Sequence, residues 1–177
     1  MTLPAYYDNI KKKIQSVIIM EITIRKAEKK DAGRLSELLE TIAQLHHNGR
    51  PDIYGANGAK YDISAVEEKI AKTDEIILVA VNEDDFVLGY TMSKIIDVEE
   101  NGILLGYRKM YIDDVCVDSA FRKNGIGKKL MEYTKLEAEK ANCHLAELNV
   151  WAFNESAINF YKSCGMTVQR MYMEYIL

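Results

Sequence analysis

Apolar residues recur along the chain with two different periods, and the changes of period predict the order of the structural elements. Alternation at Ile22 and Ile24 predicts a strand, and apolar positions at helical spacing predict helices over 29–44 and 64–72. We expect further strands over 75–81, 86–96, 103–117, 144–151 and 167–176, and further helices over 127–141 and 155–164. The resulting order, β-α-α-β-β-β-α-β-α-β, predicts a mixed α/β fold.

Capping and turn residues mark several of the expected boundaries. Asp31 suits the N-terminus of the first helix, where a negative charge meets the positive end of the helix dipole. Ser64, with Glu67 three residues later, has the pattern of a capping box at the start of the second helix. The polar residues 82–85 predict a hairpin turn, and Asn101-Gly102 predicts the next turn.

Length and composition favour one globular domain. The chain has 177 residues, of which 48% are hydrophobic and 28% charged, enough to bury a sizeable core. Residues 1–19 differ in character and are expected to be an extension of uncertain role, whereas 20–177 form a single domain. No apolar run approaches the roughly 20 residues that span a bilayer. We therefore expect no membrane anchor or secretory signal, and a cytoplasmic location.

The formal net charge of −4 argues against a nucleic-acid partner, which favours a basic face. A mildly acidic surface suits a cationic substrate instead. An odd number of cysteines without paired spacing predicts free thiols rather than a disulfide framework; they are Cys116, Cys143 and Cys164. The three histidines lie in no recognisable register with them, so we expect neither a cysteine nucleophile nor a metal site.

The segment that carries chemistry is a polar loop with two glycines between an apolar strand and a basic helix. Gly125 and Gly127 let the backbone approach an anion closely, and the N–H groups of the loop and first helical turn would point at it. Nearby basic side chains suited to a diphosphate are Arg122, Lys123, Lys128 and Lys129. This loop is neither the dinucleotide fingerprint, which has three glycines, nor a P-loop. Taken alone, it is also compatible with an ordinary strand–helix turn.

The context of the loop resembles the GNAT superfamily of N-acetyltransferases. Arg-x-x-Gly-x-Gly follows a Val-Cys-Val strand, and a helix and a strand separate it from the second motif, Asn154-x-x-Ala157-x-x-Phe160-Tyr161-x-x-x-Gly165-Met166. The resemblance covers residues 111–166, and more loosely 20–177. It implies a GNAT-type acyl-CoA N-acyltransferase fold, a mixed and mostly antiparallel sheet flanked by helices and splayed between its fourth and fifth strands. It also implies acetyl-CoA as co-substrate, with no metal.

The same resemblance implies a set of site residues. The backbone of the fourth strand would bond the pantetheine arm, through Val115, Cys116 and Val117. The loop would hold the pyrophosphate, through Arg122, Lys123, Asn124, Gly125, Ile126, Gly127 and Lys128. Asn154 matches a position that touches the pantetheine, and Tyr161 matches both a cofactor contact and the general acid beside the thioester sulfur.

The reaction expected from the resemblance is direct attack of an amine on a thioester, and it needs a base. A lysine-like amine has a pKa near ~10.4 and is protonated at neutral pH. Asp113 and Asp114 are the catalytic candidates, because they lie in an otherwise apolar strand where burial raises a carboxyl pKa. Strand alternation predicts that they face opposite sides, so at most one would face the cleft. A substrate-binding role for the pair, Glu147 as the base, and a water relay remain open alternatives; Asn149 cannot accept the proton.

The acceptor is expected to be a primary amine of a small molecule. A peptide or protein amine, and a binding module for CoA without catalysis, remain alternatives. The loop over 46–61 corresponds to the part that shapes the acceptor site in this fold, with Tyr54 and Tyr61 as candidates there. A homodimer is also open, since the expected last strand, 167–177, could lie at a sheet edge that a partner covers.

Overall fold

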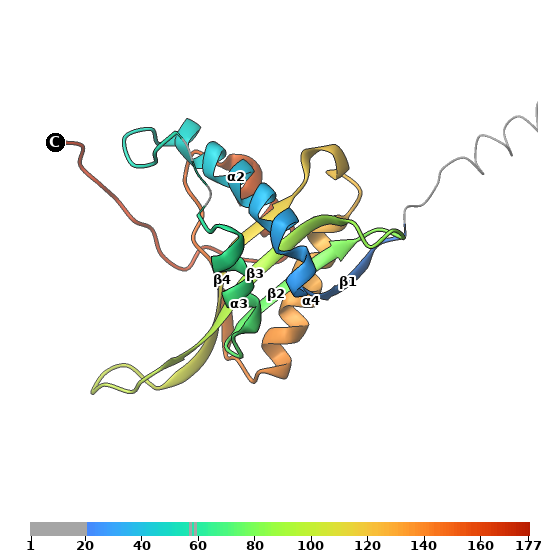
Figure 1. Cartoon of the computed structure of the whole chain (residues 1–177). Coiled ribbons are helices and arrows are strands. Elements are labelled where there is room, and N and C mark those ends of the chain that lie inside the picture. The colour runs from blue at the N-terminus through green and yellow to red at the C-terminus, as the bar shows by residue number, and fades with distance from the viewer. Residues whose placement is uncertain (1–20, 57, 59) are drawn as a thin grey trace, which may run out of the picture.

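A five-stranded sheet forms the centre of the structure (Figure 1), a computed structural model that describes residues 21–56, 58 and 60–177. The strands follow one another across the sheet in chain order. They are β1 (Thr23–Lys26), β2 (Glu75–Val81), β3 (Val87–Val98), β4 (Tyr107–Val117) and β5 (Leu145–Glu147). All neighbours are antiparallel except β4 and β5, which are parallel. This confirms the predicted mixed, mostly antiparallel sheet. The predicted extension over 1–19 lies outside the described residues.

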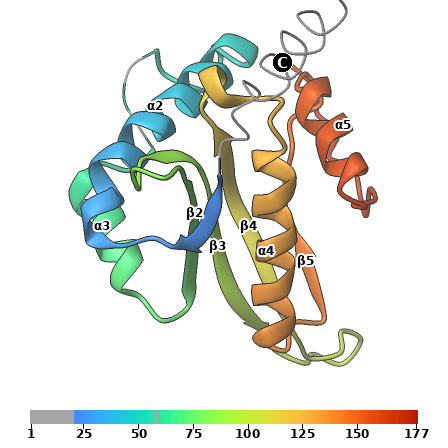
Figure 2. The same ribbon diagram turned by 90° about the vertical axis from the view of Figure 1, so that its right-hand side faces the viewer.

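Helices cover both faces of the sheet, as Figure 2 shows. They are α2 (Ala32–Gly49), α3 (Ile63–Ala71), α4 (Ile126–Lys140) and α5 (Glu155–Ser163), with short 3₁₀ turns η1 (Lys29–Asp31) and η2 (Ser119–Phe121). The sequence of β2 is continuously apolar because both faces of the strand are buried. Ile77 and Val79 pack in the cluster under α2 and α3, whereas Leu78 and Ala80 pack under α4. None of the helices in the described part of the chain combines the length and apolar character that a membrane crossing needs.

Several predicted boundaries are wrong by a few residues, each for a local reason. Helix α2 continues to Gly49, with Arg50 as its C-cap directly before Pro51, instead of ending near residue 44. Helix α3 begins one residue before Ser64, because the Asp62 side chain accepts the cap hydrogen bond from the Ala65 N–H. Strand β4 begins at Tyr107 rather than at 103, since the preceding residues form the turn at the tip of the β3–β4 hairpin.

The predicted strand over 167–176 is wrong. The chain is irregular after Gly165, and the alternating apolar side chains that suggested a strand are exposed to solvent. The cause lies next to it: β5 is only three residues long, not the eight predicted over 144–151, and pairs on one side with β4. Alternation alone makes no strand, because a strand needs a neighbour for its N–H and C=O groups. The sheet edge proposed for a partner therefore does not form.

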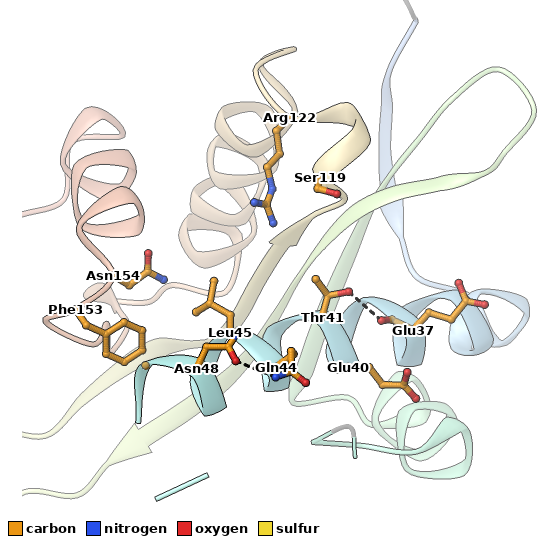
Figure 3. A pocket seen from close by; sticks show the side chains of 11 residues that line it. Glu37, Glu40, Thr41, Gln44, Leu45, Asn48, Ser119, Arg122, Phe153 and Asn154 are labelled. Atoms are coloured by element: carbon orange, nitrogen blue, oxygen red, sulfur yellow. Dashed lines mark hydrogen bonds between the residues drawn. The ribbon is translucent and has the colours of Figure 1, made fainter. Parts of the chain in front are cut away.

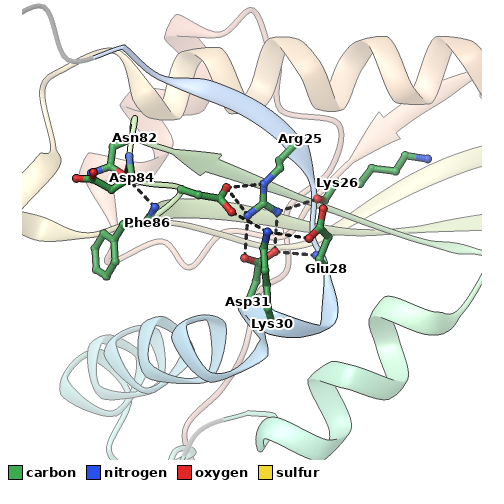
Figure 4. Close-up of polar contacts among 9 residues, drawn as sticks. Arg25, Lys26, Glu28, Lys30, Asp31, Asn82, Asp84 and Phe86 are labelled. Carbon is green, nitrogen blue, oxygen red and sulfur yellow. Dashed lines mark hydrogen bonds and ion pairs between the residues drawn. The ribbon is translucent and has the colours of Figure 1, made fainter.

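A buried carboxylate fastens β1 to the start of α2 (Figure 4). Asp31, whose side chain is 3% exposed, accepts two hydrogen bonds from the Arg25 guanidinium, at 2.7 and 2.9 Å. It also accepts the Glu28 N–H at 2.7 Å. Arg25 donates further to Asp85 in the β2–β3 turn. One guanidinium thus connects β1 and the start of α2 to the distant β2–β3 turn.

We predict that Asp31→Asn lowers the free energy of unfolding by about 3 kcal/mol, because the Arg25 charge then loses its buried partner. Chemical denaturation followed by far-UV circular dichroism measures the change. Asp85→Asn is the matched control, since that carboxylate meets the same arginine at an exposed position, and we expect a much smaller loss there. Equal losses in the two variants would contradict the role given to burial.

Candidate active site

Strands β4 and β5 pair over only three residues and then separate. Their partners are Lys109 with Leu145, Met110 with Ala146, and Tyr111 with Glu147, and no further pair joins the two strands within the described residues. This confirms the predicted splay between the fourth and fifth strands. Beyond Tyr111, one side of the β4 backbone therefore faces an opening instead of a neighbouring strand.

Backbone parity decides which groups of β4 face this opening. In an antiparallel pair, every second residue of a strand directs its N–H and C=O groups toward the same neighbouring strand. The Asp118 N–H donates to the Leu88 carbonyl, so the residue two positions before Asp118 also directs its backbone groups toward β3. This residue is Cys116, and it lies opposite Tyr90. The N–H and C=O groups of Val115 and Val117 consequently point toward the opening. Of the three strand residues predicted to bond the pantetheine, these two have backbone groups on the correct side.

A β-bulge turns both aspartates of β4 toward the same cavity. In the register with β3, Met92 pairs with Asp114 and Ser93 pairs with Ile112, which leaves Asp113 as the extra residue. Both carboxylates line one cavity of about 100 Å³ between β4, α2, α5 and the segment after β5. The prediction that the two face opposite sides is wrong, because a bulge breaks the alternation on which it rested.

The cavity also holds the predicted acid, Tyr161 on α5. Burial raises the pKa of Tyr161 to about 12, with the negative charge of Asp114 adding to the effect. Burial raises the pKa of Asp114 to about 6; the Lys60 charge opposes this rise, and the Asp113 charge adds to it. The site therefore contains a carboxyl group that exchanges its proton near neutral pH beside a phenol that keeps its proton there.

Asp113 is held by two residues that precede α3. The Lys60 ammonium lies 2.7 Å from Asp113 Oδ1, and the Tyr61 hydroxyl donates to Asp113 Oδ2 at 3.2 Å. Burial and the Asp113 charge together raise the pKa of Tyr61. The sequence indicated Tyr61 as an acceptor-site candidate but gave no role to Lys60. Lys60 and Tyr61 contact Asp113 because the loop before α3 lies against β4. The spacing of residues in the sequence does not predict this contact.

Aromatic residues and His46 form the remaining wall. The Trp151 indole N–H donates to the Tyr54 hydroxyl at 3.2 Å, and the His46 and Tyr54 rings lie 5.0 Å apart. Burial, and then the Lys60 charge, lower the pKa of His46, so its imidazole is neutral at pH 7. The sequence placed His46 at the start of the loop expected to shape the acceptor site but did not single it out. Its spacing from Ile42, four residues earlier on α2, could have placed it on the cavity face.

Glu147, the alternative residue for the base, lies elsewhere. Glu147 accepts from the Lys109 ammonium at 2.6 Å and does not line the cavity that holds the aspartates. Asn149 does line that cavity, where its side-chain amide donates to the Tyr111 hydroxyl at 3.1 Å. An amide accepts no proton, so the two aspartates are the carboxylates of this cavity.

The glycine loop has the backbone of an anion cradle. Lys123 and Gly125 both have positive φ, 67° and 77°, and Gly125 is the N-cap of α4. Alternation between right- and left-handed residues turns successive N–H groups to one side, and the helix N-terminus adds its positive dipole end. Asn124 braces the loop by donating to the Phe121 carbonyl at 3.1 Å. Ile126 anchors it in the core, whereas the Lys128 side chain is exposed beside it.

An open groove of about 860 Å³ leads from this loop toward the aspartate cavity. Arg122 and Ser119 lie along one side of the groove, and α2 lies along another. Phe153 and Asn154, which directly precede α5, also line it (Figure 3). Arg122 is oriented by donating its Nε–H to the Val117 carbonyl at 3.0 Å. Asn154 lines both the groove and the aspartate cavity, so the two are adjacent. Its side-chain oxygen caps α5 by accepting the Ala157 N–H.

The residues of the loop and strand fit a long ligand that ends in a diphosphate. Unpaired backbone groups line β4, an anion cradle follows at its end, and the groove joins both to a cavity with titratable groups. Lys129 is not available for this role, because its ammonium donates to the Ile22 carbonyl. Burial raises the pKa of the Cys116 thiol to about 12, which excludes it as a nucleophile at neutral pH.

Comparisons with known proteins agree with this geometry. The chain matches the model of the acetyltransferase (GNAT) family over residues 37–166. A relative described as an uncharacterized N-acetyltransferase in the pepI 3' region of Lactobacillus delbrueckii subsp. lactis is 24% identical over 125 residues. The match covers 66% of this chain and 71% of the relative.

Solved structures share the fold. A mutant of the BH1408 protein from Bacillus halodurans gives a TM-score of 0.84 at 27% identity, over 88% of this chain and 99% of that chain. The aminoglycoside N-acetyltransferase AAC(6')-Iy in complex with CoA gives a TM-score of 0.67 at 16% identity, over 89% of this chain and 95% of that chain. At so low an identity, the second likeness concerns the fold alone.

We predict that Gly127→Ala destabilises the contact between α4 and α5. An added Cβ would lie 3.0 Å from Cζ of Phe160, so the ring must move, at a cost of about 1–3 kcal/mol. Thermal unfolding measures the loss. Gly33→Ala on α2 is the matched control, because its Cβ would meet no atom within 4 Å. If Phe160→Leu in the Gly127→Ala background restores no stability, the close approach of the two helices is not the cause.

Proposed function

Because the chain belongs to the acetyltransferase (GNAT) family and is therefore an acyltransferase, we propose that it transfers the acetyl group of acetyl-CoA to a primary amine of a small molecule. The observation that carries this proposal is a single cavity at the β4–β5 opening that contains Asp113, Asp114 and Tyr161. It combines a group that can accept a proton near neutral pH with one that can donate a proton.

The co-substrate is proposed to lie along β4 and the glycine loop. The backbone groups of Val115 and Val117 bond the pantetheine arm, and Asn154 contacts it from α5. The pyrophosphate sits in the cradle of N–H groups between Arg122 and Lys128, at the N-terminus of α4. Acetyl-CoA supplies the acetyl group as a thioester, and its reactive end then lies at the junction of groove and cavity.

Asp114 is proposed as the base. An amine must lose a proton before it can attack, and a carboxylate with a pKa near 6 is ionised at pH 7 yet more basic than an exposed one. Asp113 is less suited, because its oxygens already accept hydrogen bonds from Lys60 and Tyr61. The Asp114 carboxylate takes the proton from the amine, directly or through one water.

Tyr161 and the β4 backbone are proposed to act on the leaving side. The Tyr161 phenol, protonated at neutral pH, donates to the departing sulfur. The Val115 N–H faces the opening and is the candidate donor to the oxygen that gains negative charge. Both groups are fixed by packing, since Tyr161 lies against the core of α4 and Val115 belongs to the sheet. The enzyme contributes positions and proton transfers, and much of the acceleration comes from proximity.

The small volume of the cavity and its closed wall favour a small amine over a peptide. Its volume of about 100 Å³ corresponds to roughly three water molecules at ~30 Å³ each, enough for the amine end of an acceptor. Trp151 and His46 close one wall of this cavity, and Tyr54 packs against both of them. The aminoglycoside N-acetyltransferase with the same fold acts on small-molecule amines, which agrees with such an acceptor.

The proposal predicts that the protein binds acetyl-CoA and releases free thiol when a suitable amine is added. Calorimetric titration measures binding, and a thiol reagent measures turnover against a panel of small amines. Gly125→Asp should abolish binding, because the position has φ +77° and the new carboxylate repels phosphate. Absence of acetyl-CoA binding by the native protein would refute the proposal. Binding without thiol release from any amine would favour a CoA-binding module.

A second prediction separates the roles of Asp114 and Tyr161. The base works only when deprotonated, so kcat/KM should rise with pH through about 6 and level off above it. Asp114→Asn should remove this limb and lower the rate about 10²–10⁴-fold. Tyr161→Phe should lower the plateau but keep the limb. The pH–rate profiles of the three proteins provide the measurement, and an unchanged limb in Asp114→Asn would assign the base to another group or to water.

A further inference from the structure

Lys60 places a cationic amine group against one of the two aspartates of the site that is proposed to receive a cationic amine. Its ammonium lies 2.7 Å from Asp113 Oδ1, and its side chain is 43% exposed against 22% for Asp113. The Tyr61 hydroxyl meets the other oxygen of the same carboxylate. Asp113 is thus fully engaged by groups of this chain before any acceptor arrives.

Asp114 differs, although the bulge places it in the same cavity. Among the described residues, no lysine or arginine side chain lies within ion-pair distance of its carboxylate. Two further titratable residues line the cavity, and neither is charged at pH 7. Burial and the Lys60 charge lower the pKa of His46, and burial raises the pKa of Tyr161 to about 12. At neutral pH the two carboxylates and one ammonium therefore give the cavity a single net negative charge. Without the ammonium the charge would be doubled.

We propose that Lys60 determines the charge of the acceptor: by neutralising Asp113, it leaves Asp114 as the one free carboxylate and so selects acceptors with a single cationic group at the reacting end. This inference rests on the proposed function and concerns the acceptor side of the same site. An acceptor with a second ammonium a few carbons away meets Lys60 instead of a carboxylate. Repulsion between the two cations, in a partly buried and weakly screened position, disfavours it.

The proposal predicts that removing the Lys60 charge improves the binding of diamines selectively. The probes are 1-aminobutane and 1,4-diaminobutane, titrated calorimetrically into protein saturated with CoA, which carries no acetyl group to transfer. In Lys60→Met the affinity for the diamine relative to the monoamine should rise about tenfold, because Asp113 becomes free to pair with the second ammonium. Lys60→Arg should keep the native ratio.

Controls separate this effect from a general loss of structure or charge. Lys135→Met removes an exposed lysine of α4 that pairs only at 3.7 Å with Glu139, and should leave the ratio unchanged. Asp113→Asn combined with Lys60→Met should show no gain, since the carboxylate released by the lysine is then missing. Thermal unfolding of each variant verifies that it is folded.

The outcomes distinguish the two proposals. An unchanged ratio in Lys60→Met, an equal gain in the double variant, or no binding of either amine to any of the proteins would overturn the role of Lys60. Failure of the native protein to release thiol with every amine would instead count against the proposed function. The binding ratio measured with CoA is independent of that result, because no acetyl transfer occurs in the titration.

Discussion

The short pairing between β4 and β5 is the constraint on which the site depends. Three residue pairs join the strands at one end, and the strands then diverge, so the backbone groups of Val115 and Val117 on this side are not paired with β5. The Val117 carbonyl instead accepts the Arg122 Nε–H. Buried backbone groups normally require partners, and an unpaired strand edge inside a protein is costly unless a ligand or water satisfies it. The proposed place of the pantetheine arm along β4 follows from this, because its amide groups would pair with the strand edge that β5 leaves uncovered.

The bulge in β4 determines where the two carboxylates of the site lie. One extra residue, Asp113, brings two adjacent carboxylates to the same cavity, where a regular strand would have sent one of them into the opposite layer. Burying both as free charges would be expensive, and the structure resolves this in two different ways. Lys60 and Tyr61 satisfy Asp113, whereas Asp114 is left with a raised pKa. Two neighbouring residues of one type thereby differ in environment, which is the basis of the separate roles proposed for them.

The helices hold these parts in place through close contacts that tolerate little change. Gly127 permits Phe160 to pack against the start of α4, which positions α5 and hence Asn154 and Tyr161. On the other face, Arg25 and Asp31 fasten β1 to the start of α2. The far end of α2 brings Ile42 and His46 to the cavity. The glycine loop and the aspartate cavity thus belong to one rigid arrangement, although the residues that form them are far apart in the chain.

The sequence by itself determined the class of fold, the order of the elements up to α5 and the position of the glycine loop, because these follow from local periodicity and from φ preferences that single residues carry. It also indicated Asp113 and Asp114, as carboxylates in an otherwise apolar strand, and Tyr161, through the resemblance of its motif to the family. Only the tertiary structure decided that both aspartates share a face, that Lys60 and His46 reach them, and that 167–176 forms no strand. Each of these depends on pairing or contact between distant segments: a bulge is defined only by its partner strand, a loop lysine finds its carboxylate only after folding, and apolar alternation makes a strand only where a free edge accepts its hydrogen bonds.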